Sequence, residues 1–344
     1  MSQLEVYIEN FLSIKSARLE ANANITFIIA PNRAGKTQLL LLLYTYYWSL
    51  WKHFTDKSSS NASKIFKEKL KGTFLVKELT DLIKWGENNT KVLIEDNLGN
   101  KLEMKIPKRA KDFCLTLDPK RVFLTKSPVY LSPAGLGDYY KGIWAIKKYY
   151  KSWRLFSEAV TDLLEDLFIV ASESTKVEDE TQKLLELFER LFNAKYHIRQ
   201  ERIYISESGK TYGLEKTASG LKSIAWYYLL MKYNLLSSVL FIDEPEANLH
   251  PEYVDRLVRF LYELSKKRKV FVATHSDYLL ESFNVYLKKK NIEANVWVGM
   301  LKEDGAYYCS YTADRKNLID TTPLNKTYTK IVEELFSYDR KIKF

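Results

Sequence analysis

Short apolar runs alternate along this chain with longer segments that suit helices. Residues 25–29, 239–242 and 270–274 are apolar almost throughout, as strands buried on both faces of a sheet are. Residues 39–43 begin one predicted helix, and the apolar stretch 224–233 forms another. Buried strands interleaved with helices favour an α/β fold whose central strands are parallel.

Alternating apolar and polar positions predict further strands. Residues 4–8 alternate strictly and residues 14–19 more loosely, so both segments predict edge strands of an N-terminal antiparallel β lobe. Residues 91–95 and 101–106 alternate on either side of a turn and predict a β-hairpin. A second hairpin is predicted over residues 299–311.

The middle of the chain, residues 143–195, predicts two helices joined by a turn at 172–175. Apolar residues recur there at three- and four-residue spacing, namely Trp153, Phe156, Val160, Leu163, Leu167, Leu184, Leu187 or Phe188, and Leu191. Each helix holds only about three heptads, so we expect a short αα-hairpin rather than a long coiled coil. A last helix is predicted over residues 328–336.

The strand at 25–29 leads into the loop Ala30-Pro-Asn-Arg-Ala-Gly-Lys-Thr37 and then into a helix. This order of strand, loop and helix is typical of a phosphate-binding P-loop. Backbone N–H groups of the loop and of the helix N-terminus would cradle phosphates. Lys36 would reach the β and γ oxygens, and Thr37 would bind Mg²⁺. The plainer interpretation is an incidental Gly-Lys-Thr before a helix.

The loop departs from the usual G-x-x-x-x-G-K-[ST] pattern at two positions. Ala30 replaces the first glycine, which is tolerable if its φ is negative, because only a positive φ strictly favours glycine. Arg33 stands where a further glycine is frequent. Its fixed charge would lie beside the expected phosphates, where it either stabilises γ-phosphate charge or contacts a facing subunit.

Two adjacent acids, Asp243 and Glu244, end the run at 239–242, and Pro245 stops the strand. Acids at the carboxyl end of a buried parallel strand are costly unless they serve a cation or a proton transfer. The pair suggests nucleotide hydrolysis assisted by Mg²⁺, with Asp243 holding the metal and Glu244 taking a proton from water. The alternative is a solvated acidic loop.

Two other strand or helix ends carry candidate residues. His275 follows the strand at 270–274, where it could hydrogen-bond a γ-phosphate or a lytic water, although a lone histidine is more often structural. Ser219 and Gly220 precede the helix at 224–233 and would present N–H groups to an anion. The alternative for Ser219 is an ordinary helix N-cap.

Composition narrows the class of protein. The chain has 344 residues, 46% hydrophobic and 28% charged, with a formal net charge of +10, so it is globular and suited to an anionic partner such as nucleic acid. Two cysteines exclude a disulfide scaffold or a zinc site. No signal-peptide pattern is evident, and the longest apolar run, 39–51, is too short to span a membrane. We expect a soluble cytoplasmic protein.

A basic and aromatic segment, residues 144–154, could track phosphates and stack bases. The alternative is an amphipathic helix with a solvated lysine face. DNA is therefore one candidate partner of the chain.

Together, Lys36, Ser219 with Gly220, Asp243 with Glu244, and His275 resemble the ABC-type ATPase head. The wording DEPEANLHP, residues 243–251, resembles the SMC/RecF/OLD-like branch of AAA-type ATP-binding proteins rather than transporter subunits. The resemblance covers about residues 1–45 and 200–300. It implies an α/β P-loop NTPase fold with an N-terminal antiparallel β lobe and a helical lid insertion. The corresponding parts are 1–142 for the P-loop lobe, 143–198 for the lid and 199–344 for the C-terminal lobe.

The resemblance also implies how such a head works. Two heads dimerise head to tail around two ATP molecules, each on one subunit's P-loop and the other subunit's Ser219 and Gly220. Asp243 would be the Walker B acid, Glu244 the catalytic base and His275 the switch histidine. The nucleotide-binding residues implied are Asn32, Arg33, Ala34, Gly35, Lys36, Thr37, Gln38, Ser219 and Gly220, with Thr37 and Asp243 as Mg²⁺ ligands.

Two family features differ in this chain. Of the LSGGQ signature of transporters only Ser219 and Gly220 are present. Such heads also carry a glutamine between the P-loop and the signature, yet no glutamine occurs between Gln38 and Gln182. The segment 130–133, after a strand-like stretch at 121–124, is the candidate replacement, and Ser132 could supply a hydroxyl. No cluster of acids typical of a Toprim nuclease follows His275.

The sequence thus predicts an ATPase that binds ATP and Mg²⁺, closes as a homodimer and drives or gates a DNA-related process such as repair, maintenance or defence. Two alternatives remain. One is a nucleotide-gated binding module with little turnover that regulates an effector protein supplied in trans. The other is the ATPase subunit of a transporter.

Overall fold

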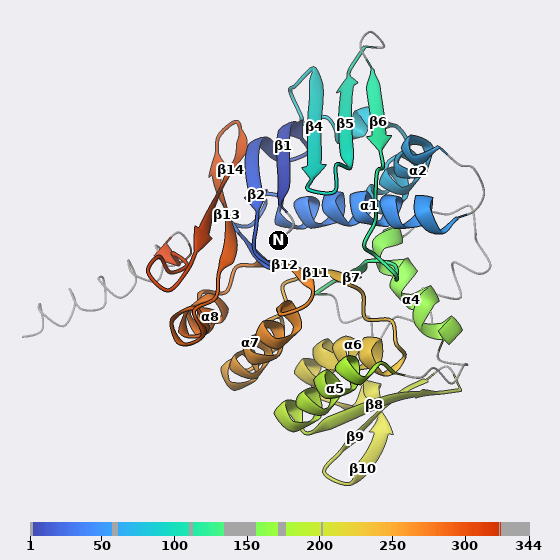
Figure 1. Ribbon diagram of the computed structural model, residues 1–344, viewed down its shortest axis with the longest axis vertical. Helices are drawn as coiled ribbons and strands as arrows, with labels where there is room; N and C mark the ends of the chain where they lie inside the picture. The colour runs from blue at the N-terminus through green and yellow to red at the C-terminus, as the bar shows by residue number, and fades with distance from the viewer. Residues whose placement is uncertain are drawn as a thin grey trace, which may run out of the picture.

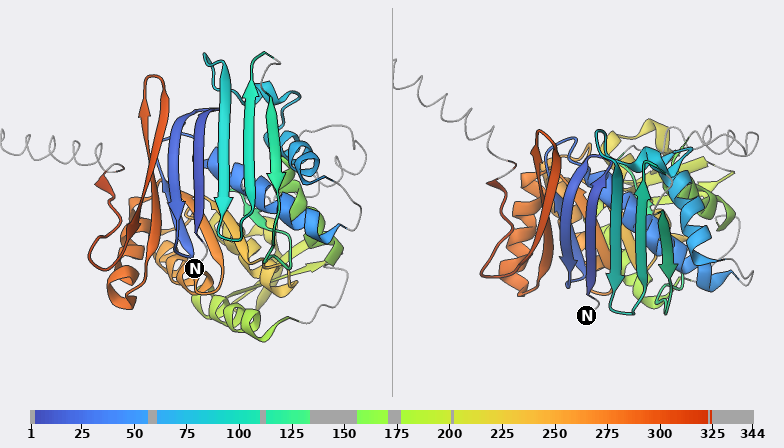
Figure 2. Two further views of the ribbon diagram at one scale, coloured as in Figure 1. Left: turned by 45° about the horizontal axis from the view of Figure 1, so that its top comes forward. Right: turned by 90° about the horizontal axis from the view of Figure 1, so that it is seen from above.

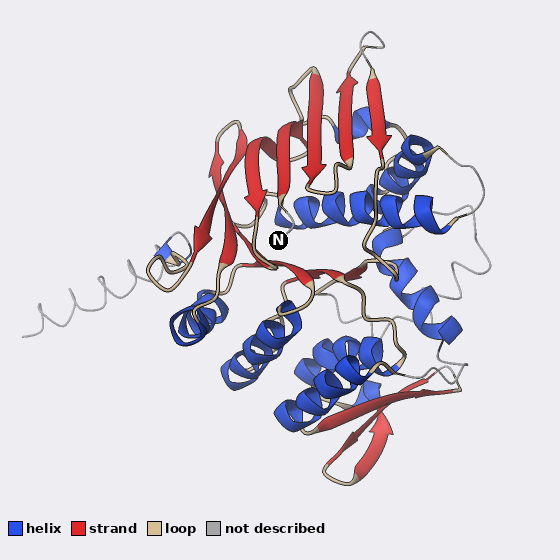
Figure 3. Ribbon diagram, in the orientation of Figure 1, coloured by secondary structure: helices blue, strands red, loops and turns tan. Residues whose placement is uncertain are grey.

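The computed structural model describes residues 3–56, 61–109, 113–133, 156–170, 177–200, 202–322 and 324. Its strands and helices form stacked layers (Figure 1). Most strands belong to one 11-stranded sheet with the order β6-β5-β4-β1-β2-β14-β13-β3-β12-β11-β7, and a separate three-stranded sheet has the order β10-β9-β8. Figure 3 shows the layers by their colours, with helices between and below the strands.

The inner half of the large sheet contains the predicted buried strands. It consists of β13 (Ala294–Lys302), β3 (Ile25–Ile29), β12 (Lys269–Thr274), β11 (Val239–Asp243) and β7 (Val129–Leu131). Neighbouring strands in this series run parallel. Every residue of β3, β11 and β12 is buried, which explains why their sequences are apolar without alternation.

The outer half of the sheet is mainly antiparallel. It consists of β1 (Leu4–Phe11), β2 (Ile14–Ala21), β4 (Asn89–Asp96), β5 (Lys101–Pro107), β6 (Cys114–Asp118) and β14 (Gly305–Ala313). Both predicted hairpins are confirmed, as β4 with β5 and β13 with β14. The two views of Figure 2 show these strands side by side across α1.

The prediction that the two N-terminal strands lie at an edge is wrong. β1 pairs with β2 on one side and with β4 on the other, and β2 pairs in parallel with β14. The closing hairpin β13–β14 thereby joins the antiparallel strands to the parallel strands in one continuous sheet. Alternation predicted the strands correctly, but it carries no information on which strand becomes an edge.

The helices cover the parallel strands on both faces. They are α1 (Lys36–Thr55), α2 (Ala62–Phe74), α4 (Glu158–Val170), α5 (Asp179–Phe192), α6 (Ser219–Lys232), α7 (Pro251–Ser265) and α8 (Asp277–Lys290), with short 3₁₀ turns η1 (Leu79–Leu82) and η3 (Leu214–Lys216). In Figure 1, α1 lies between the antiparallel and the parallel strands, and α5 to α8 lie on the opposite side of the parallel strands.

Two clusters of buried side chains hold these layers together. Phe241 faces α1 and the antiparallel strands, whereas its neighbour Ile242 faces the layer of α5 to α8. Ile28 and Phe27 on β3 divide in the same way. Each strand of the parallel half therefore contributes side chains to both cores, and the strand ends are fixed rigidly at one edge.

The middle helices do not form the predicted hairpin, in which each helix would be the other's main neighbour. α4 packs against α1, α2 and β7, while α5 packs against α6 and α7. The buried Lys69 of α2 explains the placement of α4, because it pairs with Asp162 and, at 3.3 Å, with Glu158. On α5, the Phe188 ring meets Phe260 of α7 with 5.5 Å between ring centroids.

The small sheet formed by β8 (Ala194–Arg199), β9 (Arg202–Glu207) and β10 (Lys210–Gly213) was not predicted. The predicted segments 144–154, 172–175 and 328–336 lie outside the described residues. Within the described part of the chain, no helix is long and apolar enough to cross a membrane.

Candidate functional site

The carboxyl ends of β3, β12 and β11 bring the predicted site residues to one edge of the sheet. These strands are neighbours, and their register aligns Asp243 with Ala273, and Ala273 with Ile28. Parallel strands all end at the same edge, which is where α/β proteins bind ligands. The P-loop, the acids after β11 and His275 after β12 therefore meet there.

The P-loop turns sharply at Gly35, whose φ is +91°. A Cβ atom at this position would lie 2.5 Å from Ser13 Oγ and 2.8 Å from Gln38 Oε1, and the positive φ itself favours glycine. Gly35 is also the N-cap of α1, with no side-chain cap and no acid in the first turn of the helix. The first N–H groups of α1 therefore keep their positive end open to an anion.

Lys36 is 6% exposed, and its ammonium group turns back onto the loop. It donates to Ala30 O at 2.8 Å and to Pro31 O at 3.4 Å. Burial lowers the pKa of Lys36, while the nearby carboxylates of Glu244 and Asp243 oppose that shift. The ammonium thus lies in the field of the strand-end acids, as expected of a group that would reach phosphate oxygens.

The two departures from the P-loop pattern behave differently. Ala30 is buried and is not among the residues with positive φ, so it replaces glycine without strain. Arg33 has φ of 69°, a left-handed conformation that costs an ordinary side chain free energy. Its side chain is exposed, as is that of Asn32. The left-handed backbone explains why glycine is frequent at position 33, and this chain has arginine there despite the strain.

The remaining loop residues brace the P-loop from behind. Ala34 O accepts a hydrogen bond from the Tyr308 hydroxyl at 3.1 Å. Gln38 Oε1 accepts from Ser13 N at 3.1 Å and from Ser13 Oγ at 2.7 Å. Gln38 therefore ties the P-loop helix to the turn between β1 and β2.

Asp243 lies against the first turn of α1. Its Oδ2 accepts from Thr37 Oγ1 at 2.7 Å and from the Tyr130 hydroxyl at 3.1 Å, whereas its buried Oδ1 has no protein partner. Burial raises the pKa of Asp243, and the hydrogen bonds from Thr37 and Tyr130 oppose that shift. A buried carboxylate oxygen without a donor is unusual and favours a ligand there.

Thr37 and Asp243 fit a magnesium ion that is shared with a nucleotide. Both supply hard oxygen donors, and Mg²⁺ is typically held by one or two protein groups together with phosphates and water. Among the described residues, no group of three or more histidines, cysteines or acids could hold a metal by itself. The donor set therefore suits a metal that arrives with phosphates.

Glu244 and His275 form a pair at the ends of β11 and β12. Glu244 has φ of 47°, and its N–H donates to Ala273 O at 2.8 Å. Its Oε1 lies 3.1 Å from His275 Nδ1, and the two side chains are 30% and 50% exposed. Glutamate in a left-handed conformation is strained, and such strain concentrates at functional sites.

A small cavity adjoins these acids where β7 ends. Its volume is about 20 Å³, room for roughly one water molecule, and its lining includes Ser132, Trp226, Asp243 and Glu244. The prediction of a strand at 121–124 is wrong, because that segment is an extended connection that Asn100 binds through its side chain. The strand is instead β7, which pairs with β11 and leads directly to Ser132.

Tyr130 and Glu246 were not predicted as site residues, although Tyr130 lies in the segment 130–133 that was the candidate for the missing glutamine. Tyr130 contacts Asp243 from 113 positions away in the chain, and burial raises its pKa well above the ordinary value. Glu246 accepts from Thr274 Oγ1 at 2.6 Å. A third acid in the 243–246 stretch was a visible signal for Glu246, whereas the segment 130–133 was singled out for Ser132 and not for the tyrosine.

Ser219 and Gly220 begin α6. The N-cap of the helix is Ala218 without a side-chain bond, so the interpretation of Ser219 as an N-cap is wrong. A Cβ atom on Gly220 would lie 2.9 Å from Asn248 O, so this glycine packs against the loop after β11. Within the described part of the chain, neither residue hydrogen-bonds to the P-loop.

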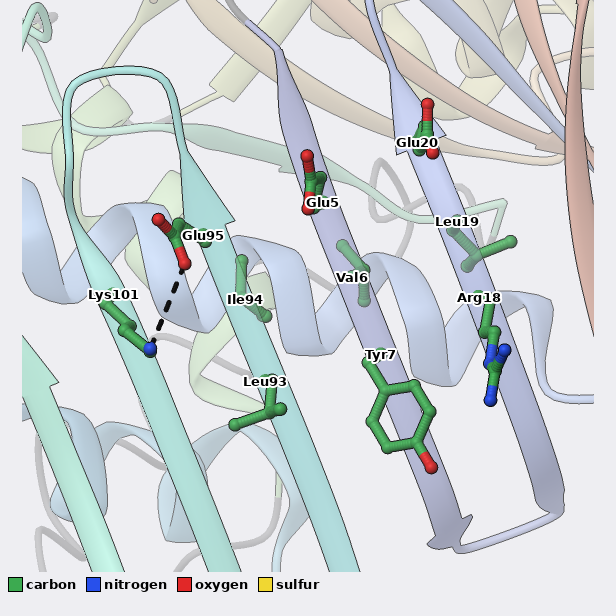
Figure 4. A pocket seen from close by; sticks show the side chains of 10 residues that line it. All are labelled: Glu5, Val6, Tyr7, Arg18, Leu19, Glu20, Leu93, Ile94, Glu95 and Lys101. Atoms are coloured by element: carbon green, nitrogen blue, oxygen red, sulfur yellow. Dashed lines mark ion pairs between the residues drawn. The ribbon is translucent and has the colours of Figure 1, made fainter.

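A larger hollow of about 300 Å³ lies elsewhere, on the outward face of β1, β2, β4 and β5 (Figure 4). Its lining mixes both signs of charge, with Arg18 over the ring of Tyr7 and Lys101 paired with Glu95 at 4.0 Å. None of the predicted site residues lines it. The strand-end edge, rather than this hollow, gathers the chemically distinctive groups.

Residues 139–281 match the family described as "AAA domain, putative AbiEii toxin, Type IV TA system". No curated protein sequence matches the chain.

Similar solved structures include the SMC head domain from Thermotoga maritima, with 15% identity, a TM-score of 0.51, and coverage of 90% of this chain and 99% of that one. An SMC head bound to the C-winged helix domain of ScpA has 11% identity and a TM-score of 0.56, with coverage of 91% of this chain and 98% of that one. An SMC head with an extended coiled coil, bound to the C-terminal domain of ScpA derived from Pyrococcus furiosus, has 13% identity and a TM-score of 0.52. The match covers 97% of this chain and 100% of that one. The chain therefore has the fold of SMC head domains.

Proposed function

We propose that this chain binds ATP with Mg²⁺, closes as a homodimer around it, hydrolyses the γ-phosphate and reopens. The observation that carries the proposal is the contact of Thr37 with Asp243 at 2.7 Å, beside the pair of Glu244 and His275 at 3.1 Å. A hydroxyl, a carboxylate, a base and an imidazole converge there next to an open helix N-terminus. This set of groups suits phosphoryl transfer to water.

The P-loop supplies the binding side of the reaction. Backbone N–H groups of the loop and of the first turn of α1 would surround the phosphates, and Lys36 would exchange its contacts with loop carbonyls for contacts with phosphate oxygens. Thr37 and Asp243 would hold Mg²⁺, which would neutralise charge on the phosphates. Arg33 adds a fixed cation at the mouth of the loop.

The strand ends supply the hydrolytic side. Glu244 accepts the proton of the attacking water while the phosphoryl group moves to the water oxygen. His275 contacts Glu244 through Nδ1 in the structure described here, which leaves Nε2 of the ring to hydrogen-bond a γ-phosphate. A histidine between the base and the γ-phosphate links the reaction to the presence of that phosphate.

Dimerisation completes the site in this proposal. Ser219 is exposed at the uncapped start of α6, where its N–H groups are available to a facing subunit's nucleotide. Gly220 packs on the loop that contains Asn248, so the two segments would meet the partner together.

We further propose a role in a DNA-related process in the cytoplasm, in line with a net charge of +10. Two of the similar SMC heads were solved with a ScpA domain bound, which supports an effector protein in trans. We retain 1–142, 143–198 and 199–344 as the proposed functional division of the chain.

The test is steady-state phosphate release by the wild type and by Glu244→Gln. Removing a general base lowers turnover by roughly 10²–10⁴-fold. Glu263→Gln is the matched control, because Glu263 is a partly exposed acid of α7 that pairs with Lys266. We expect the control to match the wild type, and Glu244→Gln to accumulate an ATP-bound dimer in light scattering.

A second candidate is a nucleotide-gated module with little turnover. It is favoured by Ser132 standing beside Asp243 and Glu244, where related heads carry a glutamine. In that case wild type and Glu244→Gln would release phosphate equally slowly while both still bind ATP.

A further inference from the structure

Glu246 is the third acid of the stretch 243–246 and has no part in the hydrolysis just proposed. Its side chain is only 9% exposed. Oε1 accepts hydrogen bonds from Thr274 Oγ1 at 2.6 Å and from His275 N at 3.3 Å. Oε2 is buried without a protein partner. A buried carboxylate that leaves one oxygen unpaired is expensive, so its presence calls for a physical reason.

The carboxylate of Glu246 connects two strand ends. It lies in the turn after β11, whereas Thr274 is the last residue of β12. Thr274 Oγ1 in turn accepts from Ser276 N at 3.0 Å, and Ser276 caps α8 by accepting from Leu279 N at 3.1 Å. Glu246 therefore fixes the stretch of main chain on which the imidazole of His275 is mounted.

The imidazole itself lies between two acids. His275 Nδ1 is 3.1 Å from Glu244 Oε1 and 3.9 Å from Glu246 Oε1. The hydrogen bond from His275 N to Glu246 Oε1, at 3.3 Å, restrains the peptide, so rotation of the side chain is the main way in which the ring can move.

We propose that Glu246 is a positioning residue that anchors the His275 peptide and presents its imidazole to Glu244, with a second acceptor in reserve. The inference rests on the proposed hydrolysis, in which Glu244 and His275 act together. A purely structural acid would gain from a second hydrogen-bond donor at Oε2. Burial also raises the pKa of Glu246, against the hydrogen bond from Thr274, so holding its charge is a standing cost.

The first arm of the test is kinetic. Because small misplacements of reacting groups cost up to roughly 100-fold in rate, Glu246→Ala should lower kcat by about that factor. Its ATP affinity should stay within about threefold of the wild type, since Lys36 and Thr37 are untouched. Glu246→Gln keeps an oxygen for both donors and should recover most of the rate. Thr274→Val, which removes one donor, should give an intermediate loss.

The matched control is Glu252→Ala. Glu252 follows the same loop at the start of α7, but its side chain is 64% exposed and pairs with Arg256. We expect wild-type turnover from it. Equal losses of kcat and of ATP affinity in Glu246→Ala, with no rescue by Glu246→Gln, would instead mean general damage to the fold and overturn the proposal.

The second arm does not depend on turnover. The chain has four histidines, so ring signals in NMR spectra of histidine-labelled protein can be assigned with His275→Gln. Glu246→Ala should shift or broaden the His275 signals while those of His53 and His197 remain in place. Unchanged His275 signals would overturn the proposal.

The two arms also separate this proposal from the proposed function. If the wild type turns over no faster than Glu244→Gln, hydrolysis is excluded, and the NMR arm alone decides on Glu246. If Glu246→Ala does not fold, Glu246→Gln and Thr274→Val supply both measurements: full rate with unchanged His275 signals in Thr274→Val contradicts the proposal.

Discussion

Two buried aspartates in this chain are exposed to a similar extent but differ in how fully the protein hydrogen-bonds their carboxylate oxygens. Asp96 is 6% exposed and Asp243 is 4% exposed. Asp96, the last residue of β4, accepts hydrogen bonds from Leu98 N, Asn100 N, Asn100 Nδ2 and the Tyr46 hydroxyl. Asp243, at the end of β11, receives two hydroxyls on Oδ2 and nothing from the protein on Oδ1.

The difference separates a structural acid from one suited to a ligand. The chain satisfies both oxygens of Asp96 locally, so that acid serves a turn. Asp243 accepts hydrogen bonds on one oxygen only, from hydroxyls on α1 and β7, and its other oxygen has no protein donor. Burial without full pairing is a cost that a bound cation would offset.

Lys36→Ala should have the largest effect, a loss of ATP affinity at the site that contains Asp243. Hydrogen bonds to charged groups contribute roughly 1.5–3 kcal/mol, so ATP affinity should fall about 100-fold. Binding of a fluorescent ATP analogue measures this. Lys52→Ala, an exposed lysine of the same helix paired with Asp56, is the control and should bind normally. Unchanged affinity in Lys36→Ala would exclude the P-loop assignment.

Exchanging the two aspartates tests the comparison directly. Asp96→Ala strands several buried donors and should reduce the free energy of unfolding by roughly 3 kcal/mol, while leaving ATP binding intact. Asp243→Asn should change stability by less than about 1 kcal/mol but weaken Mg²⁺-dependent ATP binding roughly tenfold or more. Chemical denaturation and nucleotide titration measure the two quantities. The opposite assignment of effects would reverse the roles of the two acids.

Asp243 also predicts a pH effect on stability in metal-free buffer. Burial raises the pKa of Asp243 in the folded chain above its ordinary value of 3.8. A group whose pKa is higher in the folded state than in the unfolded state stabilises the fold below its unfolded-state pKa. That stabilisation is lost as the pH rises through its folded-state pKa. Asp243→Asn should therefore gain stability relative to the wild type on going from pH 3 to pH 7. If the difference in free energy of unfolding between Asp243→Asn and the wild type does not change with pH, the raised pKa is contradicted.

Tyr130→Phe should have a smaller effect. It removes one of the two hydroxyls on Asp243 Oδ2 and keeps the ring, so the free energy of unfolding should fall by about 1 kcal/mol. Turnover should fall only severalfold, because Thr37 still holds the same oxygen. A loss as large as that of Glu244→Gln would show that Tyr130 acts on substrate rather than through Asp243.

The smallest expected effect is that of Arg33→Gly. A left-handed residue other than glycine costs roughly 1–2 kcal/mol, and the flexibility of glycine in the unfolded chain offsets part of the gain. We expect a net stabilisation of about 0.5–1 kcal/mol, seen as a higher Tm. A lower Tm would mean that the Arg33 side chain makes a stabilising contact that outweighs the backbone strain.

The parts of the fold that the sequence predicted are those set by local patterns. Continuous apolar runs predicted β3, β11 and β12, because these strands are buried on both faces. Turn residues between alternating segments predicted both hairpins. The joining of two half-sheets through β14 and β2 was not predictable, because this pairing links residues nearly 300 positions apart without a local signal.

The candidate site followed the same rule. Strand-end motifs pointed to Lys36, Asp243 and His275, and the structure places these residues at one edge of the sheet. The contact of Tyr130 with Asp243 was not predicted, because the strand of Tyr130 has only three residues and its partner is distant in sequence. The αα-hairpin failed because periodicity gives the apolar face of α4, whereas the buried Lys69 determines which helices that face meets.

The central claim is that residues far apart in the chain surround one triphosphate, and a crystal structure of Glu244→Gln with ATP and Mg²⁺ tests it most directly. The account predicts phosphates on the N–H groups of the P-loop, the metal on Thr37 and Asp243, and the γ-phosphate within hydrogen-bond reach of Lys36 and His275. A nucleotide bound elsewhere, for instance in the hollow of Figure 4, would contradict it.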